Sequence, residues 1–119
     1  SPFMQRDPRA FLWDVRESAT QIQDFVAGMD ASTYPVNAMA QAAVERKFEI
    51  IGEALNHLAK LDAALAARIS DLPKIVVFRN QLIHGYASVK ASTVWTVAQT
   101  ALPLLLAETN ALLDELGPA

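Results

Sequence analysis

Apolar residues recur at alternating steps of four and three through the middle of this chain. The series is Val44, Phe48, Ile51, Leu55 and Leu58. This spacing places all of them on one face of an α-helix, so it predicts a helix from about residue 37 to residue 61 with one buried side. No segment alternates apolar and polar residues with the period of a β-strand. The sequence therefore predicts an all-α fold.

Signals for the start and end of helices divide the rest of the chain. Asp7 and Pro8 suit the cap and the first position of a helix that ends before Gly28, and Asp62 suits the cap of a short helix. The expected helices span about residues 8–27, 37–61, 62–69, 73–83 and 91–116, with a kink at Pro103 in the last one. We expect an antiparallel bundle of four main helices plus a short helix.

Three residues carry expectations about packing. Gly52 lies inside the second helix, where it costs about 1 kcal/mol relative to alanine, so we expect it to permit the close approach of another helix. Trp13 and Trp95 occur at helical spacing and are predicted to lie in the core. The alternative for an exposed tryptophan is a surface on which a nucleobase stacks.

Length and composition fit one folded domain. The chain has 119 residues, of which 52% are hydrophobic and 19% charged, enough for one core and too few for two domains. It has no cysteine, which excludes disulfides and thiolate chemistry, and no apolar run long enough to span a bilayer. We expect a cytoplasmic protein whose single domain covers residues 4–119, with residues 1–3 a cloning remnant before Met4.

The charge of the chain is unevenly distributed. The formal net charge is −3, which does not indicate a general nucleic-acid binder. Between residues 68 and 90, however, four cations face a single acid, Asp71, a local excess of +3. The cations are Arg68, Lys74, Arg79 and Lys90. Either this segment is an ordinary solvated surface, or it supplies local contacts to RNA.

One of the two histidines lies in the segment RNQLIHGY at residues 79–86. An arginine grips phosphate through paired hydrogen bonds, an imidazole titrates near neutrality, and a phenol can donate a hydrogen bond or accept a modifying group. RNA-cleaving sites use these side chains without a metal. On a regular helix, Arg79 and His84 point about 140° apart. A site that uses both requires the helix to loosen near Gly85, or a second copy of the chain.

The spacing of Arg79, His84 and Tyr86 matches the R-x4-H-x-Y motif of the HEPN superfamily. Two further parts of the chain resemble the helices on either side of that motif: RKFEIIGEA at residues 46–54, and VW at 94–95 followed by LPLL at 102–105. From about Asp7 to Leu116 the chain resembles a HepT-type toxin. HEPN domains are helical bundles that dimerise through the motif helix, so the resemblance implies the fold class that the periodicity predicts.

The resemblance also implies a function. HepT-like toxins are metal-independent endoribonucleases of tRNA or mRNA, with a composite site at a dimer interface, and no cofactor is implied. Arg79 would stabilise charge on the phosphorus, His84 would move protons, and Asn80 and Tyr86 would support the substrate. The partner is a minimal nucleotidyltransferase, the antitoxin, which places AMP on the motif tyrosine. AMP on Tyr86 would bring bulk and negative charge into the cleft and block it.

Other interpretations of the motif stay open. His84 would also suit a helix C-terminus, where a cation complements the helix dipole, and Gly85 would then simply end the helix. An alternative function is a non-catalytic HEPN module that binds nucleotide or substrate beside a nucleotidyltransferase. A third is a helical interaction protein whose match to the motif is accidental.

Two carboxylates of the second helix are candidate supporting residues. Glu49, Glu53 and His57 follow one another at steps of four. They are too few for a metal site and lack the H-E-x-x-H spacing. We therefore expect Glu49 and Glu53 to pair with cations such as Arg46 or Arg79 and to orient the motif.

One position departs from the family pattern. Many HepT-like chains carry an aspartate that opens the final helix, and Lys90 stands at the matching position. This removes an N-cap and adds positive charge beside the motif. Ser88 or Ser92 is then the expected cap of the last helix.

Overall fold

The fold of this chain, seen in a computed structural model that describes residues 6–85 and 89–118, is made of helices alone within those ranges. The elements are α1 (Pro8–Phe25), a 3₁₀ turn η1 (Tyr34–Val36), α2 (Ala38–Leu61), α3 (Ala63–Ala66), α4 (Leu72–His84) and α5 (Ala91–Leu116). The predicted all-α class is confirmed, and the predicted helix boundaries are right to within a few residues. The predicted cloning remnant and Tyr86 lie outside the described residues.

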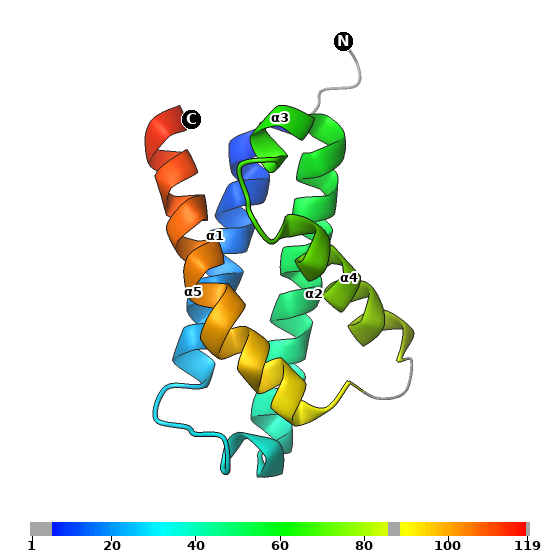
Figure 1. The fold of residues 1–119 in the computed structure, drawn as a ribbon. Helices are drawn as coiled ribbons and strands as arrows, with labels where there is room; N and C mark the ends of the chain where they lie inside the picture. Colours follow the sequence, from blue (N-terminus) through cyan, green and yellow to red (C-terminus); the bar gives the residue numbers. More distant parts are fainter. Residues whose placement is uncertain (1–5, 86–88, 119) are drawn as a thin grey trace.

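Three long helices form the centre of the bundle. α1 packs against both α2 and α5, whereas α4 packs mainly on α2 (Figure 1). In Figure 1, α4 stands at the edge of the molecule beyond α2, and α5 changes direction along its length, as Pro103 predicts. The periodic apolar face of α2 lies inside the core. Its residues Val44, Phe48, Ile51, Leu55 and Leu58 are each at most 1% exposed.

Side-chain caps fix the starts of the helices. Asp7 accepts a hydrogen bond from the backbone N–H of Arg9 at 2.9 Å, and Asp62 accepts one from Leu65 at 3.0 Å, so both predicted caps are confirmed. At α5 the cap position is Lys90, which makes no side-chain capping hydrogen bond. The expectation for Ser92 is wrong, because Ser92 lies inside α5, and the alternative cap Ser88 lies outside the described residues.

The prediction of a buried Trp13 is also wrong. Leu12 occupies the core-facing position of α1, and the next side chain along, Trp13, is 55% exposed. The guanidinium of Arg16 lies 5.0 Å from the centre of the Trp13 ring system and covers part of it. Trp95 is half-buried and packs against the core, with its ring centroid 5.5 Å from that of Tyr34.

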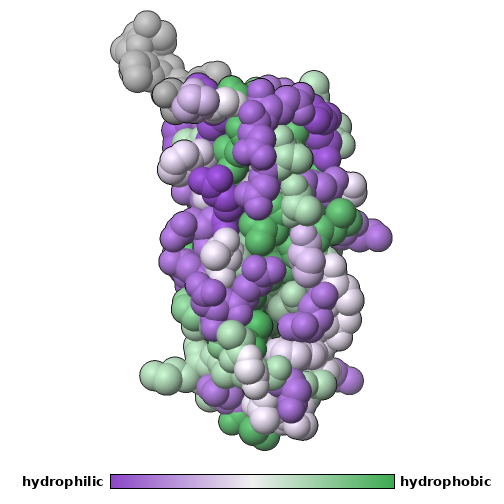
Figure 2. Space-filling view, turned by 90° about the vertical axis from the view of Figure 1, so that its left-hand side faces the viewer, coloured by the Kyte–Doolittle hydropathy of each residue, from purple (hydrophilic) through white to green (hydrophobic). Residues whose placement is uncertain are grey.

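The outer surface mixes polar and apolar groups. On the face shown in Figure 2, hydrophilic residues dominate the upper part, and apolar residues reach the surface in patches along the middle and toward the lower end. The most exposed large apolar residues are Val36 at 83% and Met39 at 84%, at the start of α2. None of the helices in the described part of the chain is long and apolar enough to cross a membrane.

Candidate functional site

Arg79 and His84 of the motif lie on α4, which an aromatic pair anchors to α2. Leu72, Ile75 and Phe78 are the buried residues of α4. The Phe78 ring meets the ring of Phe48 on α2 edge to face, with centroids 5.2 Å apart and planes at 85°. α4 ends at Gly85, whose φ of 60° is left-handed and whose N–H donates to the carbonyl of Gln81. The helix is therefore regular through His84.

At Gly52, α2 and α4 approach each other closely, and Gly52 meets the stem of Arg79. A Cβ atom added at Gly52 would overlap the Cβ of Arg79 and lie 2.5 Å from its Cγ, whereas ordinary contacts of this kind begin at 3.4 Å. The predicted close approach at Gly52 is confirmed, and the neighbour it admits is the motif arginine.

The guanidinium of Arg79 is half-buried and makes one hydrogen bond. Its Nη1 donates a hydrogen bond of 2.9 Å to Oδ1 of Asn80. Its Nε is buried and has no hydrogen-bond acceptor within residues 6–85 and 89–118. The structure thus brings Arg79 and Asn80 together, although adjacent residues on a helix do not share a face. The long arginine side chain bridges that separation.

His84 is the last residue of α4 and is exposed to solvent. Because α4 stays regular through His84, the turn of about 140° between Arg79 and His84 persists in the folded chain. Arg79 faces α2, and His84 lies at the free end of the helix. This position suits both interpretations offered above, proton transfer to a ligand and complementing the dipole of α4.

The two candidate supporting carboxylates do not pair with the motif arginine. Among the described residues, no ion pair joins Arg79 to Glu49 or Glu53. Glu53 lies 3.8 Å from Nε2 of His57 instead. Glu49 is half-buried and lies near Glu45. Burial of Glu45 raises the pKa of its carboxyl group, and the negative charge of Glu49 raises it further.

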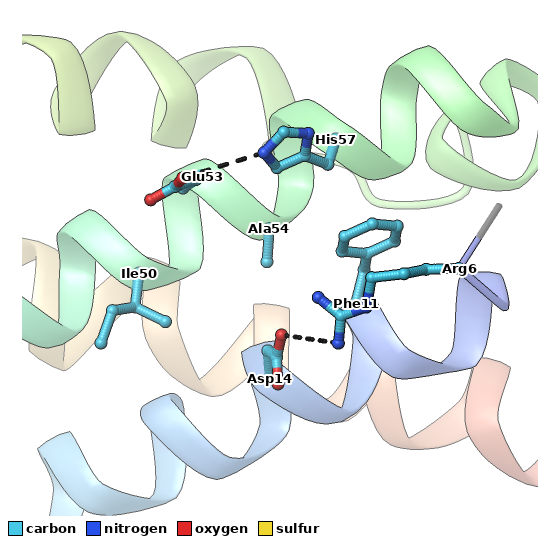
Figure 3. Close-up of a pocket in the computed structure, with 7 residues that line it drawn as sticks. All are labelled: Arg6, Phe11, Asp14, Ile50, Glu53, Ala54 and His57. Atoms are coloured by element: carbon cyan, nitrogen blue, oxygen red, sulfur yellow. Dashed lines mark ion pairs between the residues drawn. The ribbon is translucent and has the colours of Figure 1, made fainter. Parts of the chain in front are cut away.

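Figure 3 shows where Glu53 and His57 point. They border a pocket of about 350 Å³ between α1 and α2, whose opposite wall carries an ion pair between Arg6 and Asp14 at 3.5 Å. Phe11 lies between the two pairs, stacked on His57 and covered by Arg6. Both walls are thus paired within themselves, and neither Arg79 nor His84 lines the pocket. No group of three or more potential metal-binding side chains occurs in the part of the chain that the structure describes.

The four cations of residues 68–90 have different roles in the structure. Arg68, which follows α3 in the chain, makes an ion pair of 2.7 Å with Glu115 on α5. This ion pair links the segment after α3 to the last helix. Lys74 and Lys90 are exposed. The basic surface available to a ligand near the motif is therefore smaller than the sequence indicates.

The comparisons with known proteins agree with this architecture. A family model described as "Ribonuclease HepT-like" matches residues 15–112. A protein of Methanocaldococcus jannaschii named "Putative RNase" is 31% identical over 106 residues, covering 87% of this chain and 94% of that protein. A protein of Thermococcus cleftensis named "Probable ribonuclease HepT" is 28% identical, covering 86% of this chain and 92% of its own. No solved structure matches the chain significantly.

The chain is thus a helical protein of the ribonuclease class, and the family match extends over most of its length. It belongs to the HepT-like ribonuclease family. This confirms the family and the class of enzyme predicted from the motif and the segments around it.

Proposed function

We propose that this ribonuclease is the toxin of a toxin–antitoxin pair, acting in the cytoplasm on tRNA or mRNA without a metal ion. The observation that carries the proposal is the placement of Arg79. A charged side chain is held in the seam between two helices, beside Asn80 and on the same helix as an exposed His84. A guanidinium that stabilises charge and an imidazole that moves protons are two groups that can carry out RNA cleavage without a metal.

The reaction follows from these groups. The 2′-hydroxyl of the RNA attacks the adjacent phosphorus, and the bond to the 5′-oxygen of the next nucleotide breaks, leaving a cyclic phosphate. His84 takes the proton from the 2′-hydroxyl or delivers one to the leaving oxygen, an effect typically worth about 10²–10⁴-fold. Arg79 stabilises the negative charge that accumulates on the phosphate oxygens. Asn80 keeps the guanidinium in place.

A second copy of the chain completes the site. Arg79 and His84 of one chain start from different sides of a regular α4, so a second chain that brings its own motif helix offers a way to place both groups on one phosphate. Two apolar residues of α4 are exposed, Val77 at 55% and Ile83 at 43%, at positions about 120° apart around the helix. A partner chain packed along α4 would bury apolar surface at such positions. In the proposed dimer, Arg79 of one chain works with His84 of the other.

Regulation rests on Tyr86, one residue beyond the C-cap of α4. We propose that a minimal nucleotidyltransferase antitoxin transfers AMP to its hydroxyl. The added phosphate would place negative charge two residues from His84, where it repels RNA phosphate and occupies the cleft. A mass increase of one AMP on the wild-type chain after incubation with the partner and ATP, lost in Tyr86→Phe, tests this step.

Cleavage of total tRNA in EDTA by the purified protein tests the ribonuclease proposal. His84→Ala and Arg79→Ala should each lower the rate by about 10²-fold or more. His57→Ala is the matched control, because His57 is the other histidine, is exposed, and lies in the pocket away from the motif. Equal rates for wild type, His84→Ala and Arg79→Ala would contradict the proposal. An inert wild-type chain with unmodified Tyr86 would favour the non-catalytic binding module.

A further inference from the structure

We propose that Gly52 is a positioning residue for the reaction: the missing side chain on α2 sets where the Arg79 guanidinium emerges from the seam between α2 and α4. This inference rests on the proposed role of Arg79. It assigns a function to a residue that makes no chemical contact with RNA. Its basis is the contact between Gly52 and the stem of Arg79.

The atoms that meet Gly52 are the ones that a side chain cannot easily move. They are Cβ and Cγ of Arg79, with Cδ at 3.4 Å from the position of an added Cβ. Cβ is fixed by the backbone of α4, so no rotation about χ1 can relieve an overlap there. A methyl group at residue 52 therefore requires α4 itself to shift by about 1 Å, the difference between the overlap distance and an ordinary contact.

The rest of the arginine is also constrained, so a shift at the stem reaches the guanidinium. Nε is buried in the seam and Nη1 is bonded to Asn80 on the same helix. The outer edge of the guanidinium is then the part left for a phosphate. A displacement of about 1 Å in such a group can cost about 10²-fold in rate, because the charge no longer meets the transition state.

Gly52 also runs against the intrinsic preference of its helix. Glycine inside a helix is less favourable than alanine by about 1 kcal/mol. Gly52 is the described glycine that lies within a helix, while Gly28, Gly85 and Gly117 have positive φ at helix ends or turns. At those three positions an added Cβ meets nothing within 4 Å. The contact with Arg79 is therefore the structural reason for a glycine at residue 52 despite this cost in helix stability.

Gly52→Ala is the direct test, measured as kcat and KM for RNA cleavage on protein shown to be folded by circular dichroism. We expect kcat to fall by about 10²-fold with KM changed much less, because Arg79 acts in the transition state. The matched control is Ile51→Val, a loss of one methyl group at the next residue, which is fully buried and does not overlap the stem of Arg79. Ile51→Val should keep the wild-type kcat at temperatures where it is folded. A folded Gly52→Ala chain with wild-type kcat overturns the inference.

A second measurement does not depend on how Gly52→Ala folds or on whether RNA is cleaved. The Arg79 Nε–H resonance in the wild-type protein can be assigned by ¹⁵N NMR through its disappearance in Arg79→Lys. Burial in the seam predicts exchange with water that is at least tenfold slower than for exposed arginines such as Arg46. Exchange at the rate of Arg46 overturns the inference. If Nε–H is protected but RNA is not cleaved, the proposed function fails while the fixed position of Arg79 stands.

Discussion

Replacing Phe78 with alanine tests whether one aromatic anchor holds the motif helix on the bundle. Phe78 is 7% exposed, and Phe48, its partner on α2, is 1% exposed. The other buried residues of α4 are Leu72 and Ile75. The Phe78 ring is therefore the largest apolar group that α4 buries, and α4 packs mainly on a single neighbouring helix, α2.

The cost can be estimated from this burial. Truncating a buried phenylalanine to alanine costs about 3–5 kcal/mol in free energy of unfolding, including the cavity that remains. Domains of this size are stable by about 5–15 kcal/mol, so the variant loses at least about a fifth of its stability. The melting temperature should fall on the order of 15 °C. Because α4 packs mainly on α2, we expect the amides of α4 to exchange faster than those of α1.

Urea unfolding followed by circular dichroism measures the free energy, and hydrogen exchange with mass spectrometry locates the weakened segment. Lys74→Ala on the same helix is the matched control, because Lys74 is exposed and its truncation should cost less than about 0.5 kcal/mol. If Phe78→Ala costs no more than Lys74→Ala, the anchoring argument is refuted. It is also refuted if exchange accelerates equally in α1, α2 and α4.

Two further changes probe polar groups outside the motif. Thr109 is fully buried, and its Oγ1 lacks a hydrogen-bond partner among the described residues. Thr109→Val should therefore raise the free energy of unfolding, measured by calorimetry, by about 1 kcal/mol. A lower melting temperature of the variant would contradict this prediction. Asp30 accepts hydrogen bonds from Ser32 and Thr33, which lower its pKa from 3.8 to about 2. Asp30 therefore stabilises the fold above about pH 4, and this contribution disappears as the pH falls toward 2. In Asp30→Asn, the free energy of unfolding measured in urea should fall less between about pH 4 and pH 2 than it does in the wild type. The same fall in both proteins would contradict this role of Asp30.

Most of the fold could be predicted from the sequence, because the determinants are local. The apolar series of α2 has the period of a buried helix face, and Asp7 and Asp62 are caps that act within three residues of themselves. Trp13 was mispredicted because spacing alone does not show how wide the buried face of α1 is. The cap of α5 was mispredicted at Ser92 because Lys90 holds the cap position without a side-chain hydrogen bond.

The site was predictable in its residues but less so in its geometry. The motif spacing singled out Arg79 and His84, and the helical period already placed them on different sides. The contact of Gly52 with Arg79 depends on which helix crosses α2 and at what height, and neither is set by local sequence. Glu49 and Glu53 were expected to pair with cations such as Arg46 or Arg79. Glu53 instead lies beside His57, which is one turn further along the same helix. Glu45 was not identified from the sequence as a neighbour of Glu49. Its position four residues before Glu49 on the same helix could have indicated it.

Purified heterodimers test most directly whether one active site draws on two chains. Two affinity tags isolate dimers in which one chain carries Arg79→Ala and the other His84→Ala. A shared site predicts about half of the wild-type rate, since one of the two equivalent sites keeps both residues. Dimers of a wild-type chain with an Arg79→Ala, His84→Ala double variant should then be inactive. The reverse result, an inactive first heterodimer and an active second one, would show that both residues act from the same chain and would contradict the claim.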